Sequence, residues 1–255
     1  MNILDKFDLT NKVSLITGAS KGIGLAIAKA LGEAGSKIVI SSRNQSALDI
    51  EAAKLSEIGI DVTAIAANIG DSASMQNLVD QTTIIYGGID VLVNNAAANP
   101  AFGSVMDTSL DAYDKIMTVN VKGPFELTKM IHPLMVSRGG GSIINISSIG
   151  GLTPEPMVGI YSVSKAALIS LTKVMAKELG GNNIRANVIC PGLIKTKFSE
   201  ALWKNEKILG SIMHKQPIRE IGEPEDIAGL ALFLATDAAS YCTGGVYTAD
   251  GGYTI

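Results

Sequence analysis

A tyrosine and a lysine four residues apart form the clearest chemical signal in the sequence. Tyr161 and Lys165 bound the segment 161–165, and both side chains would lie on one face of it if the segment is helical. A free phenol has a pKa of about 10, and a cation held beside it stabilises the phenolate and lowers that pKa. We therefore predict that Tyr161 acts as an acid or base near neutral pH.

Ser148 would bring a hydroxyl to the same site. It follows the apolar run 142–147, which reads as a strand, so its side chain would stand at the strand end and could hydrogen-bond a substrate oxygen. A site of this composition, with no metal ligands and no strong nucleophile-base pair, suits proton transfer to or from a carbonyl or alcohol oxygen. It cannot supply a hydride, so the interpretation requires a cofactor.

The elements that must position these residues follow from the hydrophobic pattern. Short apolar runs rich in β-branched residues alternate with segments of helical periodicity, which indicates a parallel sheet covered on both faces. The runs are residues 13–16, 37–41, 62–66, 89–93, 142–147, 184–189 and 246–249. No internal repeat, low-complexity segment or linker marks a second domain. We predict one α/β domain over residues 1–255, with a seven-stranded parallel sheet.

A glycine-rich turn follows the first of these runs. Gly18, Gly22 and Gly24 lie between it and the apolar helical segment 25–31. Glycines at such a turn let the backbone approach a pyrophosphate, whose charge is met by the amides and dipole of the helix N-terminus. In the first βαβ unit this turn indicates a doubly wound Rossmann fold that binds a dinucleotide.

The end of the second run indicates which dinucleotide is bound. A carboxylate there usually binds a ribose 2′-hydroxyl, but residues 41–44 read Ser-Ser-Arg-Asn and contain no acid. Ser42 and Arg43 at this end, with Lys21 inside the glycine turn, favour a 2′-phosphate. We predict NADP(H) as the cofactor. The alternative is that Arg43 only opens a solvated helix.

Three asparagines could also serve the site. Asn68, with Ile69 after it, ends the third run and could meet the adenine edge, while Asn95 and the small residues after it end the fourth. Asn120 lies in a long helical segment, where an amide fits poorly unless it binds backbone or water. It is either structurally satisfied or part of a proton path.

Together these motifs resemble the short-chain dehydrogenase/reductase family over nearly the whole chain. The residues that carry the resemblance are the glycine turn, Asn94-Asn95-Ala96, Asn120, Ser148, Tyr161, Lys165 and Pro191-Gly192. The resemblance implies that Tyr161 is the general acid/base and that Lys165 holds the nicotinamide ribose and lowers the phenol pKa. It also implies that Ser148 orients the substrate carbonyl and that Asn120 anchors a water linking the lysine to solvent.

The motifs and the resemblance also predict the cofactor contacts. The residues expected to bind the cofactor are Gly18, Ser20, Lys21, Ile23, Ser42, Arg43, Asn68, Ile69, Asn95, Tyr161, Lys165, Pro191, Ile194 and Thr196. The chain departs from the family pattern at Ala97, where glycine is usual, and at Asn68, where an acid is common. Asparagine keeps hydrogen-bonding ability without the charge, so the departure affects only the adenine contact.

Two segments are expected to select the substrate, because both would lie at the carboxyl ends of the strands. They are residues 152–158 and a lid at about 193–216. The apolar side chains expected around the pocket are Phe102, Leu152, Met157, Phe198, Leu202, Trp203 and Met213. The segments 99–103 and 192–203 resemble the family's NADPH-dependent carbonyl reductases, a branch that includes retinal reductases. This predicts reduction of apolar ketones or aldehydes.

Two alternative functions remain. A 3-oxoacyl-[acyl-carrier-protein] reductase would share the fold, cofactor and catalytic residues but must dock an acidic carrier, which favours arginines at the pocket rim. Residues 179–183 lack a cation where those reductases often have one. A catalytically silent NADP(H)-binding sensor or scaffold would have lost Tyr161, Lys165 or Ser148, and none is missing.

Composition narrows the partners and the location. The formal net charge is −3 and no block of like charges occurs, which argues against nucleic acid or an anionic membrane as the main partner. The N-terminus lacks a signal-peptide core and the C-terminus is not of the Ser-Lys-Leu type, so we expect a cytoplasmic protein. Family members are commonly tetramers, and the segments 166–179 and 246–249 are candidate contacts in a homotetramer.

Overall fold

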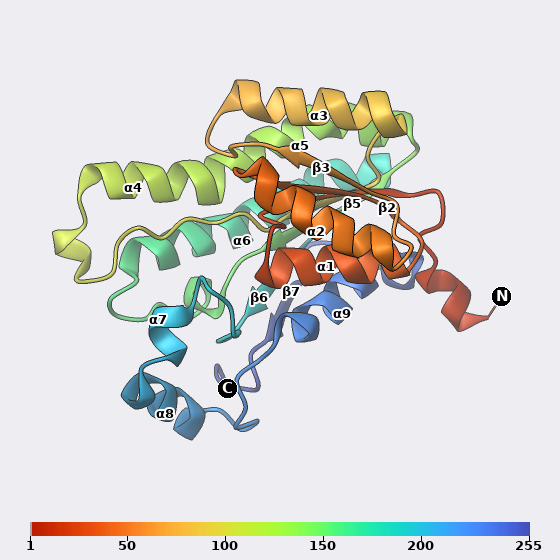
Figure 1. Cartoon of the computed structure of the whole chain (residues 1–255). Coiled ribbons are helices and arrows are strands. Elements are labelled where there is room, and N and C mark those ends of the chain that lie inside the picture. Colours follow the sequence, from red (N-terminus) through yellow and green to blue (C-terminus); the bar gives the residue numbers. More distant parts are fainter. Residues whose placement is uncertain (1) are drawn as a thin grey trace.

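A seven-stranded parallel sheet forms the centre of the protein, as the computed structural model of residues 2–255 shows (Figure 1). The strand order is β3-β2-β1-β4-β5-β6-β7. The strands are β1 (Val13–Thr17), β2 (Lys37–Ser42), β3 (Val62–Ala66), β4 (Val91–Asn94), β5 (Gly141–Ile146), β6 (Ile184–Pro191) and β7 (Val246–Ala249). The predicted doubly wound fold and its seven strands are confirmed, with ends shifted by one or two residues.

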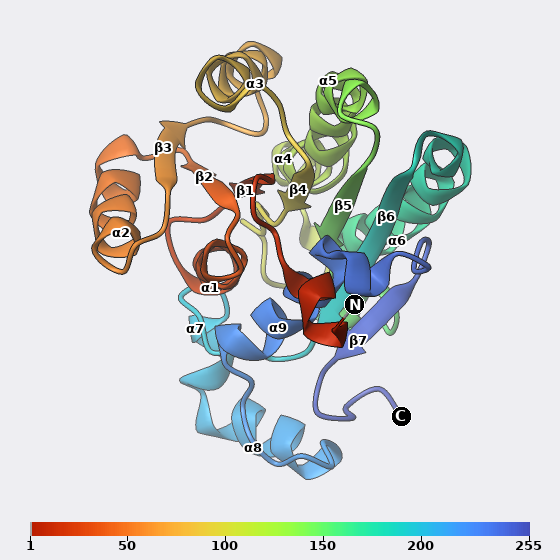
Figure 2. The same cartoon turned by 90° about the vertical axis from the view of Figure 1, so that its right-hand side faces the viewer.

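Helices cover both faces of the sheet (Figure 2). They are α1 (Gly22–Glu33), α2 (Gln45–Glu57), α3 (Ser72–Tyr86), α4 (Leu110–Met117), α5 (Gly123–Ser137), α6 (Gly159–Leu179), α7 (Glu200–Trp203), α8 (Glu206–Lys215) and α9 (Pro224–Ala235). α1, α2 and α9 lie on one face, and α3, α5 and α6 lie on the other. None of the helices in residues 2–255 has both the length and the apolar character needed to cross a bilayer.

The strands read as continuous apolar runs because both of their faces are buried. In β1, Leu15 packs in the core under α3 and α5, while its neighbour Ile16 packs in the core under α1 and α9. Both residues have no exposed surface. Burying a side chain of this size stabilises the fold by about 1.5–3 kcal/mol. The apolar residues that predict each strand therefore also stabilise the packing of the helices on both faces of the sheet.

The order of the strands creates the place for a ligand. β1 pairs with β2 on one side and with β4 on the other, so the connections leaving β1 and β4 diverge at the carboxyl edge of the sheet. A crevice at such a switch point is where open α/β sheets bind their ligands. The switch brings the turn after β1 next to the end of β4, although these segments lie far apart in the sequence.

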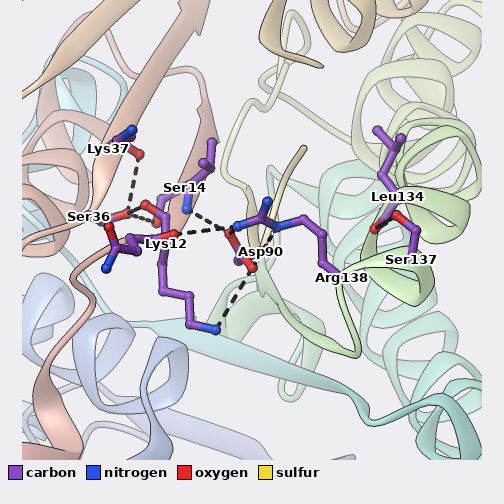
Figure 3. Close-up of polar contacts among 10 residues, drawn as sticks. Lys12, Ser14, Ser36, Lys37, Asp90, Leu134, Ser137 and Arg138 are labelled. Atoms are coloured by element: carbon purple, nitrogen blue, oxygen red, sulfur yellow. Dashed lines mark hydrogen bonds and ion pairs between the residues drawn. The ribbon is translucent and has the colours of Figure 1, made fainter. Parts of the chain in front are cut away.

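At the amino-terminal ends of the strands, Asp90 links three neighbouring elements (Figure 3). Its carboxylate accepts hydrogen bonds from the Val13 amide at 2.9 Å and from Arg138 Nε and Nη2 at 2.9 and 2.8 Å. Lys12 Nζ lies 3.9 Å away. The hydrogen bond to Asp90 raises the pKa of Arg138. Asp90 therefore joins the start of β1 to the end of α5, across the beginning of β4.

Replacement of Asp90 by alanine should destabilise the protein by about 3 kcal/mol, because it leaves a buried amide and a guanidinium without their acceptor. Urea unfolding measures the change in the free energy of unfolding. Glu33→Ala is the matched control, since its pair with Lys29 is exposed and should contribute less than about 0.5 kcal/mol. Equal effects for the two variants would contradict the assignment of Asp90 as a tie between elements.

Candidate active site

A cleft of about 1040 Å³ opens at the carboxyl edge of the sheet, at the switch point. It is lined by every residue that the sequence predicts to bind the cofactor, from Gly18 to Thr196, and also by Ser148. The segments that line it follow β1, β2, β3, β4, β5 and β6 and include the start of α6. The sheet thus gathers into one place residues that come from along most of the chain.

The glycine turn is held by the end of β4. Thr17 Oγ1 accepts hydrogen bonds from the Asn95 and Ala96 amides at 3.1 Å each, and Asn95 Nδ2 donates to the Thr17 and Gly18 carbonyls at 2.9 and 3.1 Å. Gly18 has a φ of +66°, and a Cβ there would lie 2.8 Å from Asn95 Nδ2. Only glycine fits this conformation and this close approach. Asn95 therefore supports the cleft wall by fastening the turn.

Two cations line the part of the cleft below the ends of β1 and β2. Lys21 and Arg43 are exposed, and no ion pair within residues 2–255 includes either of them. Asn44 caps α2 by accepting a hydrogen bond from the Ala47 amide at 3.0 Å. The helix is therefore opened by Asn44, and the guanidinium of Arg43 has no structural role in the helix start.

Tyr161, Lys165 and Ser148 come together where α6 passes the end of β5. Lys165 Nζ lies 5.5 Å from the centre of the Tyr161 ring and donates a hydrogen bond to the Ile146 carbonyl at 2.8 Å. Lys165 is 2% exposed. Ser148 follows β5 and lines the same cleft as Tyr161. The helical spacing of four residues thus places the phenol and the ammonium as neighbours, as the sequence pattern predicts.

The direction of the Tyr161 pKa differs from the sequence-based prediction. Burial raises the pKa of Tyr161 to about 12, and the hydrogen bond from Ser148 offsets this only in part. Burial also lowers the pKa of Lys165 to about 8. At this buried position the phenolate loses more stabilisation from water than its neighbouring groups supply. Burial disfavours the charged ammonium of Lys165 in the same way. The prediction that Lys165 brings the phenol pKa towards neutrality is therefore wrong for this arrangement of residues, and Tyr161 is a protonated phenol at neutral pH.

Asn120 lies on a π-helical turn, Thr118–Lys122, between α4 and α5. Its Oδ1 accepts a hydrogen bond from the Ala98 amide at 2.8 Å, and its Nδ2 donates to the Ala98 carbonyl and to Ser164 Oγ at 3.0 Å each. The long predicted helix is therefore interrupted where this amide turns inward. The side chain is fully satisfied and fastens the segment after β4 to α6. It does not line the cleft.

The segment expected to be a lid begins directly over the cleft. The Phe198 ring lies 6.0 Å from the Tyr161 ring, and a Cβ on Gly22 would lie 3.2 Å from Thr196 Cγ2. Trp203 Nε1 donates a hydrogen bond to the Thr196 carbonyl at 2.9 Å. Beyond this point α7 and α8 extend away from the sheet, and α8 has no buried residue (Figure 1).

The apolar residues predicted around the substrate divide into three groups. Phe198 lines the cleft, and Met157 lines a small cavity beside Tyr161. The others line neither of these two cavities and are Phe102, Leu152, Leu202, Trp203 and Met213. Asn99 and Lys115 line the cleft although the sequence did not single them out. No sequence signal distinguishes Lys115 from a solvated lysine on an amphipathic helix.

Comparison with known proteins places the chain in a family. The family model described as "Enoyl-(Acyl carrier protein) reductase" matches residues 18–254. The human protein "Dehydrogenase/reductase SDR family member 4" is 45% identical over 244 residues, which cover 96% of this chain and 88% of that protein.

Solved structures of related enzymes have the same fold as this chain. A gluconate 5-dehydrogenase from Burkholderia cenocepacia J2315, in complex with NADP and tartrate, is 31% identical with a TM-score of 0.95 and covers 99% of each chain. A 7α-hydroxysteroid dehydrogenase complexed with NADH and 7-oxo glycochenodeoxycholic acid is 33% identical with a TM-score of 0.95, covering 99% of this chain and 98% of the other. A fold, a cleft and relatives of this kind lead to one conclusion: the chain belongs to the short-chain dehydrogenase/reductase family, whose members are oxidoreductases that use NAD(P)(H) and act on CH–OH groups.

Proposed function

We propose that this protein is an NADP(H)-dependent reductase of apolar ketones or aldehydes, with Tyr161 as the general acid. The observation that carries the proposal is the grouping of Tyr161, Ser148 and Lys165 at one end of a dinucleotide-sized cleft, with the Phe198 ring 6.0 Å from the phenol. A protonated phenol beside an apolar ring suits a carbonyl substrate that must receive a proton.

The cleft residues divide the work. The bound cofactor would supply the hydride. Tyr161 donates its proton to the substrate oxygen, and Ser148 hydrogen-bonds the same oxygen as negative charge develops on it. Lys165 carries a positive charge close to the phenol at neutral pH, which stabilises the phenolate that proton donation leaves behind. Asn120 holds the neighbouring backbone in place, and a water bound beside it would link the lysine to solvent.

The glycine turn and the ends of β2, β3, β4 and β6 would hold the cofactor, and the cations at the β2 end support NADP(H) over NAD(H). The two solved relatives carry NADP in one case and NADH in the other, so relatedness alone does not choose between them. The chain's own residues support NADP(H), because Lys21 and Arg43 line the cleft without an acidic partner in residues 2–255 and no acidic residue directly follows β2. A 2′-phosphate would supply the negative charge that pairs with these two cations.

Removal of Arg43 should therefore weaken NADPH binding selectively. In the Arg43→Ala variant we expect the dissociation constant for NADPH to rise about tenfold or more, since a charge-assisted hydrogen bond contributes about 1.5–3 kcal/mol, while that for NADH stays within about twofold. Titration of cofactor fluorescence measures both constants. Lys29→Ala removes an exposed cation outside the cleft and is the control. An equal loss for the two cofactors, or a native preference for NADH, would refute the assignment of the 2′-phosphate site.

The substrate class is tested by cofactor consumption against an aromatic α-diketone, retinal and an acetoacetyl thioester. We expect turnover of the diketone or of retinal with NADPH. Preference for the thioester would instead favour a 3-oxoacyl-[acyl-carrier-protein] reductase, the second candidate. Tight NADPH binding without turnover of any of the three would favour a catalytically silent sensor.

We also propose a homotetramer, a cytoplasmic location and a lid over residues 193–216. Exposed apolar side chains on α5 and α6, namely Phe125, Val163 and Val174, support an assembly through these helices. Analytical sedimentation tests the assembly and cell fractionation tests the location.

The proposed lid over residues 193–216 is tested by limited proteolysis. Loss of protease sensitivity in α7 and α8 on binding of cofactor and substrate would support the lid.

A further inference from the structure

Besides Lys21, Arg43, Lys165 and Lys197, the cleft is lined by Lys115, which lies on the side opposite to Lys21 and Arg43. Lys115 lies on α4, and a Cβ built on Gly70 would lie 3.8 Å from its Nζ and 3.5 Å from Asn68 Oδ1. The ammonium therefore stands beside the Asn68–Gly70 bend that follows β3. Although Asp111 and Asp114 are on the same helix, no ion pair among residues 2–255 includes Lys115.

The two groups of cations belong to opposite layers of the fold. Lys21 and Arg43 precede α1 and α2, which share a core on one face of the sheet. Gly70 precedes α3 on the other face, and α4, which carries Lys115, packs against α6 on that same face (Figure 2). A ligand lying between the ends of β2 and β3 would therefore meet Lys21 and Arg43 on one side and Lys115 on the other.

The bend beside Lys115 presents hydrogen-bond donors. Asn68 Oδ1 already accepts a hydrogen bond from the Gly70 amide at 3.1 Å, so the side chain has its Nδ2 to offer. An ammonium carries three donors and no acceptor. The ring nitrogens of adenine are uncharged acceptors. A donor-rich edge of this kind matches those nitrogens, and it is separated from the cations that suit the 2′-phosphate.

We propose that Lys115 is a further cofactor-binding residue, one that donates a hydrogen bond to a ring nitrogen of the adenine base of the cofactor. The proposal rests on the dinucleotide-binding part of the proposed function, and it is independent of the substrate and of the choice between NADP(H) and NAD(H). Because NADPH and NADH carry the same base, Lys115 contributes equally to the affinity for both cofactors.

The test compares Lys115→Met with Lys115→Gln and measures dissociation constants for NADPH and NADH by fluorescence titration without any carbonyl substrate. Loss of one hydrogen bond should raise both constants by roughly fivefold in Lys115→Met and leave their ratio unchanged. Lys115→Gln keeps a donor without the charge and should stay within about twofold of the wild type. Lys129→Met, an exposed lysine on α5 away from the cleft, controls for the loss of one surface charge.

The salt dependence of the loss separates a base contact from a phosphate contact. A hydrogen bond to an uncharged base should give the same fold-loss at about 0.02 M and 0.2 M salt, whereas pairing with a phosphate weakens as salt screens it. Unchanged affinity in Lys115→Met, or a loss confined to NADPH, would overturn the proposal. Neither outcome depends on turnover, so a failed substrate prediction leaves this test decisive.

Discussion

Replacement of Tyr161 by phenylalanine should lower kcat/KM for carbonyl reduction by about a thousandfold. The change removes one oxygen atom and with it the proton donor, and a positioned general acid typically contributes 10²–10⁴ in rate. The phenyl ring can still pack beside Phe198, so the cleft keeps its shape. The dissociation constant for NADPH should therefore change by no more than about threefold, and the loss should appear in kcat.

Tyr241→Phe is the matched control, because the Tyr241 side chain is fully exposed and remote in sequence from every segment of the cleft. It should leave both the rate and the affinity unchanged. Turnover of Tyr161→Phe close to the wild-type rate would remove Tyr161 from the role of general acid and would leave Ser148, which lines the same cleft, as the remaining donor to test.

Lys165→Met should make stability less dependent on pH in the alkaline range while abolishing activity. Burial lowers the pKa of Lys165 from 10.5 to about 8. As pH falls from 10.5 to 8, the unfolded chain takes up a proton at this lysine that the folded protein does not, so folding stability decreases over this window and the loss is complete below pH 8. The buried lysine thus destabilises the protein at neutral pH, by roughly 3 kcal/mol.

The measurement is the difference in the free energy of unfolding between Lys165→Met and the wild type, without cofactor, at pH 10 and at pH 8. This difference should shift in favour of the variant by roughly 2 kcal/mol as pH is lowered, whereas the cost of depriving the Ile146 carbonyl of its donor is the same at both values. Lys177→Met, an exposed lysine on α6, should show no such shift. A shift of the opposite sign would mean that the folded protein holds Lys165 charged more strongly than water does.

This lysine illustrates how far sequence reasoning reaches. The spacing of four residues predicts that Lys165 lies beside Tyr161, because helical geometry alone decides it. The direction of their pKa values is different in kind, since it depends on how much protein surrounds both groups once α6 packs against the end of β5. The spacing of residues in a sequence does not show how deeply they are buried. The relative position of Tyr161 and Lys165 was therefore predicted correctly, whereas the direction of the Tyr161 pKa shift was predicted wrongly.

The same division holds for the polar residues around the cleft. Asn120 is recognisable as an amide in an apolar helical stretch, but the sequence leaves two roles open, and its hydrogen bonds to Ala98 and Ser164 are made by segments distant from it along the chain. Lys115 is an ordinary lysine in an amphipathic pattern, and only the approach of α4 to the bend after β3 places it at the cleft. The hydrogen bond from Arg138 to Asp90 likewise cannot be predicted from the local sequence, because the two residues are far apart in the chain.

The features of this protein that can be predicted from the sequence are therefore those governed by short-range rules. β-branched runs set the strands, because a strand buried on both faces must be apolar throughout; glycines set the turn after β1, because only they adopt its backbone; helical spacing set the Tyr161 and Lys165 pair. Three other features depend on how the elements pack together: which side chains meet across the switch point, how deeply Tyr161 and Lys165 are buried, and where Lys115 lies. Those properties arise from contacts between elements that are distant in the chain, and burial sets their energies.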